Sequence, residues 1–272
     1  MVSAVLPDYA ELHCVSNFSF LRGASHPEEL AARAAALGYT ALAITDECSL
    51  AGVVRAHVAA KQHRIKLLVG AEFHIEDGPQ IVLLATDRNA YGNLSQLITT
   101  ARRRSAKGQY RLEWDDLGSV IGCLCVMVPA SVMSNAAAEL AHAQRLREIF
   151  PDRSWLAAEL LCGPDDRGRL MQLQQLATAA QLPLVAAGDV HMHVRSRRPL
   201  QDTLTAIRLG VPVAEAQHTL HANAERHLRM RMRLAQIYPP ELLAETLHVA
   251  GRCDFSLDCL RYEYPEELVP DG

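Results

Sequence analysis

Acidic and imidazole side chains recur at the ends of short apolar segments in this chain. His13 lies in "AELHCVS", Glu72 in "VGAEF", and Asp189 and His191 in "AAGDVHM". Mixed carboxylate and imidazole ligands suit Zn²⁺, Mn²⁺ or Fe²⁺. A metal held in this way can generate hydroxide and stabilise a phosphoryl transition state. These residue types therefore make metal-dependent phosphoester hydrolysis one chemistry to weigh.

Other polar residues accompany this set. Glu11 shares a strand face with His13, since side chains alternate along a strand, and Asp46 and Glu47 end the segment "AITDE". Each residue alone has a simpler interpretation: His13 suits a hydrogen-bonded core histidine, and Asp46 suits a helix N-cap or loop anchor. Only the joint pattern, with several coordinating side chains at strand ends, favours a site.

Apolar strand-like segments alternate with helical segments along the whole chain. The predicted strands cover residues 10–16, 40–46, 66–75, 80–86, 122–129, 155–161 and 182–192. The predicted helices cover residues 26–38, 51–64, 89–104, 135–150, 166–181, 198–210 and 239–253. Nearly all-apolar strands between helices indicate a mostly parallel sheet buried on both faces. We expect an α/β barrel, in which residues at the carboxyl ends of the strands converge at one mouth.

Composition limits the classes of function. The chain has 272 residues and a net charge of −4, so no global basic field draws it to nucleic acid. Seven cysteines without a CxxC pair indicate neither a disulfide framework nor a structural zinc site. No signal peptide or membrane-length apolar run is present, which predicts a cytoplasmic protein with no membrane partner.

Two basic runs, "ARRRSAKGQYR" (101–111) and "ERHLRMRMR" (225–233), could hold phosphates. The candidate phosphate contacts are Arg102, Arg103, Arg104, Arg229 and Arg231. The first run equally suits a helix C-terminus or a solvated face, and the second could face another part of a larger protein. Aromatic residues make up only 5% of the chain, so no stacking platform for single strands is evident.

The strand-end residues, in their order, resemble the motifs of the PHP (polymerase and histidinol phosphatase) superfamily. The segments "ELHCVS", "ITDEC", "GAE" and "DVH" follow the order of that family's motifs. Long strings such as "VAAGDVHMHVRSRRPLQDTLTAIRLG" are similar to the N-terminal PHP domains of bacterial error-prone DNA polymerases, relatives of the polymerase III alpha subunit. The resemblance covers essentially the whole chain and implies a distorted (β/α)7 TIM-like barrel of PHP type.

The resemblance also implies a degenerate metal site. Matches to the family's ligands stand at His13, Glu72, Asp189 and His191, with Glu47 in place of a histidine. Two further positions depart from the family's ligand pattern. Val15 stands where a second histidine would be, and Gln80 where replicative relatives carry another. We therefore expect at most a partial Zn²⁺ or Mn²⁺ site, with no certain cofactor, since losing ligands costs a site affinity and geometry.

We expect three residues to support the ligands of that site without binding a metal themselves: Glu11, Asp46 and Arg22. Arg22, in "FLRGAS", stands near a position where the family often has an acidic residue. An unpaired carboxylate at a buried barrel mouth is costly. Our hypothesis is that Arg22 places a fixed cation where related proteins hold a metal.

The resemblance predicts a largely structural PHP barrel over residues 1–255, with residues 256–272 beginning a linker to a polymerase core. It implies that the longer chain performs error-prone, translesion synthesis with Mg²⁺ during DNA repair and damage-induced mutagenesis. Its implied partners are that polymerase core, DNA, a sliding clamp and mutagenesis accessory proteins. The polymerase aspartates lie outside this sequence. The alternative is a metal-dependent phosphoesterase or 3′-5′ exonuclease, and a third possibility is DNA binding through the arginines.

Overall fold

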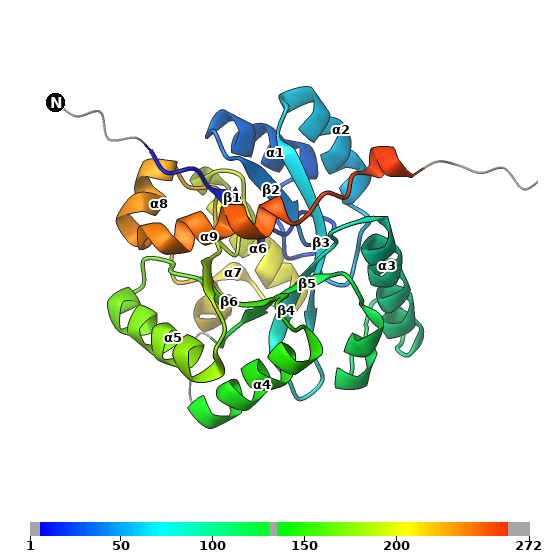
Figure 1. Ribbon diagram of the computed structural model, residues 1–272. Coiled ribbons are helices and arrows are strands. Elements are labelled where there is room, and N and C mark those ends of the chain that lie inside the picture. The colour runs from blue at the N-terminus through cyan, green and yellow to red at the C-terminus, as the bar shows by residue number, and fades with distance from the viewer. Residues whose placement is uncertain (1–5, 131–134, 261–272) are drawn as a thin grey trace, which may run out of the picture.

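A curled seven-stranded sheet organises the computed structural model, which describes residues 6–130 and 135–260. The strands follow one another in chain order around the sheet (Figure 1). Their bounds are β1 Ala10–Glu11, β2 Ala41–Ile44, β3 Lys66–His74, β4 Gln80–Leu84, β5 Leu124–Val128, β6 Ser154–Ala158 and β7 Leu184–Ala186.

The sheet closes on itself beyond its first and last strands. A parallel bridge joins Cys14 to Val190. In it, Val15 N donates to Val190 O at 2.9 Å, and Val190 N donates to His13 O at 2.9 Å. All neighbouring strands run parallel except β4, which is antiparallel to both β3 and β5. The predicted distorted α/β barrel is therefore confirmed.

Helices surround the barrel (Figure 1). The α-helices are α1 Pro27–Ala36, α2 Val53–His63, α3 Arg88–Arg103, α4 Ala136–Ile149, α5 Asp166–Ala180, α6 Arg198–Leu209, α7 Val213–Ala216, α8 Arg231–Ile237 and α9 Pro240–Gly251. The sequence patterns predicted all of these except the short α7 and α8. Among the described residues, no helix combines the length and hydropathy that crossing a bilayer requires.

Local sequence signals explain where the helices begin and end. Asp87, Asn135 and Asp165 are the N-caps of α3, α4 and α5, and each side chain accepts the N–H three residues later, at 2.8, 3.1 and 3.0 Å. The helix α6 ends at Gly210, whose φ of 69° is the left-handed conformation that glycine adopts without strain. These caps fix the helices that cover the barrel.

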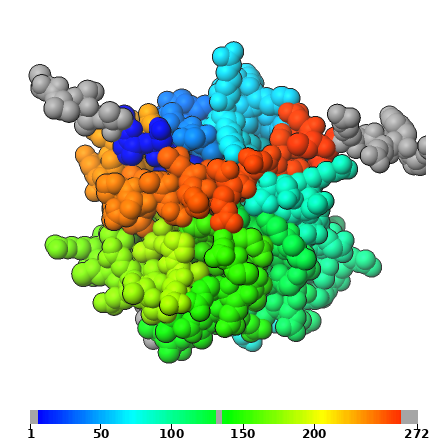
Figure 2. Space-filling model, in the orientation of Figure 1, coloured from blue at the N-terminus to red at the C-terminus, as the bar shows by residue number. Residues whose placement is uncertain are grey.

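Alternate side chains of the strands fill the barrel interior. They form one buried cluster that includes Leu68, Val82, Leu84, Val126, Trp155 and Val185. Val249 and Cys253, from the end of α9 and the residues after it, belong to the same cluster. Figure 1 shows α9 crossing in front of the strands, and Figure 2 shows its surface spanning that face of the molecule. One end of the barrel is therefore closed by a helix, and the polar residues lie at the other.

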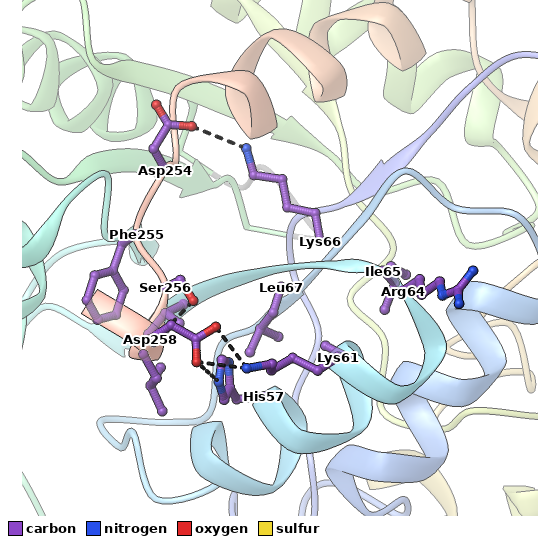
Figure 3. A pocket seen from close by; sticks show the side chains of 13 residues that line it. His57, Lys61, Arg64, Ile65, Lys66, Leu67, Asp254, Phe255, Ser256 and Asp258 are labelled. Carbon is purple, nitrogen blue, oxygen red and sulfur yellow. Dashed lines mark hydrogen bonds and ion pairs between the residues drawn. The ribbon is translucent and has the colours of Figure 1, made fainter. Parts of the chain in front are cut away.

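The chain after α9 crosses the outside of the barrel and is fastened to α2. Phe255 stacks on Tyr91 with a ring-centroid distance of 4.5 Å. Asp258 accepts from Lys61 Nζ at 2.9 Å and lies 3.3 Å from His57 Nε2 (Figure 3). A cavity of about 420 Å³ separates this segment from α2 and from Lys66, the first residue of β3. The segment predicted to begin a linker is thus packed as far as residue 260, and residues 261–272 lie outside the described part.

A buried carboxylate also holds the first strand to the last. Glu11 Oε1 accepts from Gly188 N at 2.9 Å, from Leu12 N at 3.1 Å and from His13 N at 3.0 Å. Its second oxygen accepts from Tyr9 Oη at 2.9 Å. This single side chain satisfies backbone donors on both sides of the closing seam.

We predict that Glu11→Ala lowers the free energy of unfolding by about 3 kcal/mol, because buried N–H groups lose their acceptor. Urea denaturation of the 272-residue chain measures the effect. The matched control is Glu241→Ala, at an exposed position on α9, which we expect to change little. Equal effects of the two substitutions would contradict the role given to Glu11.

Candidate functional site

The barrel mouth receives its polar residues from the same strand faces that build the core. The inward positions of β6 and β7 continue from Ala157 to Glu159 and from Ala187 to Asp189. In β3, Glu72 faces inward in the same register as Leu68 and is fully buried. The antiparallel strand β4 begins at this end, so its first residue also lies here. The barrel mouth therefore holds several carboxylates next to the apolar side chains of the barrel interior.

His13 lies between two of these carboxylates. Its Nε2 is 2.7 Å from Glu72 Oε2, and its Nδ1 is 2.7 Å from Glu159 Oε1. Burial alone would lower the pKa of His13, but the hydrogen bonds to Glu159 and Glu72 overcome it and raise the pKa to about 10. In this arrangement the two carboxylates favour the protonated form of His13, and each of its ring nitrogens faces one of them.

Arg22 joins Glu72 to a further carboxylate, that of Glu47. Its Nη1 donates to Glu47 Oε2 at 2.8 Å and also to Glu72 Oε1. Gln80 Nε2 donates to Glu72 Oε2 at 3.1 Å. Burial would raise the pKa of Glu72, but His13 and Arg22 lower it to about 2. Arg22, the residue of the fixed-cation hypothesis, therefore pairs with Glu72 in this structure.

Asp46 fastens the loop that carries Arg22. Its Oδ1 accepts from Ser16 N at 2.7 Å, Ser19 N at 3.1 Å and Ser19 Oγ at 2.7 Å, and its Oδ2 accepts from Ser16 Oγ at 2.8 Å. The backbone packs closely at Gly23 in the same loop, because a Cβ at that glycine would lie 2.0 Å from Ser16 O. Asp46 acts here as an anchor for residues 16–25.

Asp189 and His191 form the other side of the mouth. His191 Nε2 is 3.0 Å from Asp189 Oδ1, and Arg226 pairs with Asp189 Oδ2. His191 Nδ1 is 3.3 Å from the backbone oxygen of Arg22. Burial, with the nearby charge of Arg22, lowers the pKa of His191 to about 4. A neutral imidazole has one N–H, so His191 donates to only one of these two oxygens while it lies between the Arg22 loop and the segment after β7.

The residues present do not fit the metal cluster that the fold suggests. Both ring nitrogens of His13 face carboxylates, and both oxygens of Glu72 and of Asp189 face protein groups. Two guanidinium groups occupy the positions beside the carboxylates, and the inert Val15 supplies no ligand. Across residues 6–130 and 135–260, no group of three or more His, Cys, Asp and Glu side chains is arranged to hold a metal ion.

A cavity of about 700 Å³ adjoins this network. Gln80, Glu159, Asp189, Arg169 and Arg226 are among its lining residues. Arg169 Nη2 donates to the backbone oxygen of Pro129 at 3.0 Å, at the cavity wall. The cavity is polar and carries both signs of charge, and it offers space beside the network.

The predicted phosphate contacts are mostly engaged with the protein itself. Arg102 donates to the backbone oxygens of Glu47 and Cys48 at 3.1 and 3.2 Å, and Arg104 pairs with Asp116 through bonds of 2.6 and 2.7 Å. Two further candidates, Arg229 and Arg231, lie near the N-terminus and the barrel. Arg229 is 2% exposed and donates to Leu160 O at 2.8 Å, and Arg231 pairs with Asp8 at 2.9 Å. Arg103 is exposed.

Sequence reasoning missed Glu159 and underrated Arg226. Glu159 lies near the end of the predicted strand 155–161, so the strand-end argument that selected Asp189 could have selected it too. Arg226 was visible only as one member of a basic run. It reaches the mouth because Met192 pairs with His227 in an isolated bridge, and His191 N and Met192 N both donate to Arg226 O. No periodic pattern in the sequence predicts this contact between Arg226 and the segment after β7.

The fold agrees with comparisons to known proteins. The sequence matches the PHP domain family over residues 11–157, and the chain belongs to that family. A solved structure from Bifidobacterium adolescentis, described as a candidate metal-dependent phosphoesterase, has a TM-score of 0.51 and 18% identity. It covers 68% of this chain and 88% of its own length, and it supports the fold alone.

Curated relatives are much longer. The error-prone DNA polymerase of Dechloromonas aromatica is 60% identical over 98% of this chain, which spans 26% of that protein. The error-prone DNA polymerase of Aromatoleum aromaticum is 59% identical over 97% of this chain, which spans 25% of that protein. The predicted similarity to the PHP domain of these polymerases is confirmed, and the chain corresponds to their N-terminal quarter.

The pairing of His13 predicts how stability depends on pH. Its pKa of about 10 in the fold exceeds the ordinary value of 6.5, so pairing stabilises the fold fully below pH 6.5 and is lost as pH rises through about 10. We expect the stability gap between the wild type and His13→Gln to be largest at pH 6.5 and to narrow by pH 10. Urea denaturation across that range measures the gap, and a pH-independent gap would contradict the pairing.

Proposed function

We propose that this chain is a structural PHP domain of an error-prone, C-family DNA polymerase, with a barrel mouth held by arginines in place of a metal cluster. The observation that carries the proposal is the position of Arg22, whose guanidinium joins Glu47 to Glu72. The proposed barrel covers residues 1–255, with residues 256–272 beginning the connection to the polymerase core.

The names of the relatives support a proposal for the activity of the longer chain. We propose that it adds nucleotides to DNA with Mg²⁺ in the cytoplasm, during translesion synthesis, DNA repair and damage-induced mutagenesis. A sliding clamp and mutagenesis accessory proteins are its proposed partners. The PHP domain contributes to this activity by stabilising the chain and not by catalysing a reaction, because its candidate ligands are already bound to cations.

Two of the candidate metal ligands, Glu72 and Asp189, have specific structural tasks in this proposal. Glu72 forms ion pairs with His13 and Arg22, and so connects the first strand to the third. Asp189 receives Arg226, and so fastens the segment after β7. These contacts cross the barrel where its strands are shortest, since β1 spans only Ala10–Glu11 and β7 only Leu184–Ala186. The network replaces strand pairing that the short strands cannot supply.

We predict that Arg22→Ala lowers the free energy of unfolding by roughly 3–5 kcal/mol, because it removes one of the two cations that neutralise the buried carboxylate of Glu72. Urea denaturation of the 272-residue chain measures the loss. The matched control, Arg103→Ala, removes an exposed arginine and is expected to change stability by less than about 0.5 kcal/mol. Full stability of Arg22→Ala would argue against the structural role.

Metal content separates the proposal from the phosphoesterase or exonuclease alternative. After incubation with Zn²⁺ or Mn²⁺ and desalting, we expect the wild-type chain to retain far less than one equivalent by mass spectrometry. Retention of an equivalent that His191→Ala abolishes would instead support a metal-dependent enzyme. In that case, hydrolysis of a phosphodiester substrate by the wild type, and not by the variant, would establish the alternative.

A further inference from the structure

An exposed apolar surface lies beside the polar network. Phe20 is 81% exposed, and Ile207 on α6 is 58% exposed. Leu200, Leu204 and Ile207 follow one another at spacings of four and three, so they share one side of α6. Phe20, Leu200 and Leu204 also line a cavity of about 250 Å³. We call Phe20, Leu200, Leu204 and Ile207 the Phe20–α6 face.

The Phe20–α6 face is held rigidly from below. The loop that carries Phe20 is anchored by Ser16 and Ser19 on Asp46, and by the Arg22 side chain on Glu72. The helix is tied to the same loop, because Gln201 Nε2 donates to Arg22 O at 2.7 Å. An exposed aromatic side chain on an ordered loop can bind a partner without the entropic cost of ordering that loop.

Backbone conformation supports the same conclusion about the loop. Leu21, directly after Phe20, has a φ of 59°, in the left-handed region that a leucine adopts only when its surroundings impose it. Along the chain it lies between Ser19, which is hydrogen-bonded to Asp46, and Arg22, which is paired with Glu72. These anchors therefore flank an unfavourable backbone conformation next to Phe20, whose large apolar side chain projects into solvent.

We infer that the Phe20–α6 face is the surface against which the remainder of the polymerase chain packs. This inference rests on the proposed function. The chain spans only 26% of a relative 60% identical to it, so about three quarters of such a polymerase lies outside the structure. Contiguous exposed apolar surface marks an interaction site in soluble proteins, and the missing polymerase body is its occupant.

The path of the chain is consistent with that occupant. The segment after α9 is fastened on α2 by the contact of Asp258 with Lys61 and His57. From there, α2 exposes Val58 and Val54, one turn apart, toward its N-terminal end. The residue before α2, Gly52, abuts the Phe20 loop, since a Cβ there would lie 3.2 Å from the Phe18 ring. The helix α2, to which Asp258 is fastened, therefore begins beside the loop that carries Phe20.

Hydroxyl-radical footprinting tests the assignment without any substitution. We expect Phe20 and Ile207 to be oxidised in the 272-residue chain and protected in the full-length polymerase that contains it. Met171, exposed on α5 outside the face, is the internal control and should be oxidised equally in both. Equal oxidation of Phe20 in the two proteins would overturn the inference.

A variant checks the energetic consequence. We expect the double substitution Phe20→Ser and Ile207→Ser to lower the melting temperature of the full-length polymerase and to leave that of the 272-residue chain unchanged. Met171→Ser should change neither. A full-length polymerase that tolerates the double substitution without loss would contradict the docking surface, even if Arg22→Ala confirmed the structural role of the network.

Sedimentation of the 272-residue chain tests the competing occupant, a second copy. We expect a monomer at micromolar concentration, because the face is assigned to the polymerase body. A dimer that Phe20→Ser and Ile207→Ser dissociate would assign the face to self-association and overturn the inference. These outcomes are independent of the Arg22→Ala result, so failure of the inference and failure of the proposed function are distinguishable.

Discussion

Neutralising buried negative charge at the barrel mouth is the constraint on which the rest of the structure depends. The inward face of the strands carries apolar side chains through the barrel and then, at their ends, Glu72, Glu159 and Asp189. Such carboxylates are tolerable in an apolar setting only when a cation accompanies them. Here His13, Arg22 and Arg226 provide it, and these pairings cross between the strand ends.

A guanidinium differs from a metal ion in what it can do. It neutralises carboxylates and holds them in a fixed geometry, but it stays protonated and does not activate a bound water as Zn²⁺ does. Arg22 is also part of the chain, so the cation that neutralises Glu72 simultaneously fixes the loop after β1. A metal would leave that loop free to be placed by other contacts. In the proposed function, Arg22 therefore neutralises Glu72 without supplying hydrolytic chemistry, and it connects the mouth to the surface.

Sequence alone could predict most of the fold, because core-forming strands and capped helices have local signals. The seven longer helices and all strands were predictable from apolar segments and residues such as Asp87, while α7 and α8 are too short to show a period. The strand-end argument found His13, Glu72 and Asp189. It could not find the partner of Asp189, since Arg226 arrives through an irregular bridge far along the chain. Nor could composition distinguish the buried Arg229 from an arginine on a solvated face.

The network also explains why polar residues persist at a mouth that does not fit a metal cluster. Glu11 and the Cys14–Val190 bridge join the first and last strands, which are too short to pair extensively. Removing the mouth carboxylates would leave Arg22 and Arg226 as the uncompensated buried charges. Each partner therefore constrains the other, and neither can be lost singly without cost. Because α6 is bound to the Arg22 loop through Gln201, that mutual dependence extends from the closing seam of the barrel to its apolar outer face.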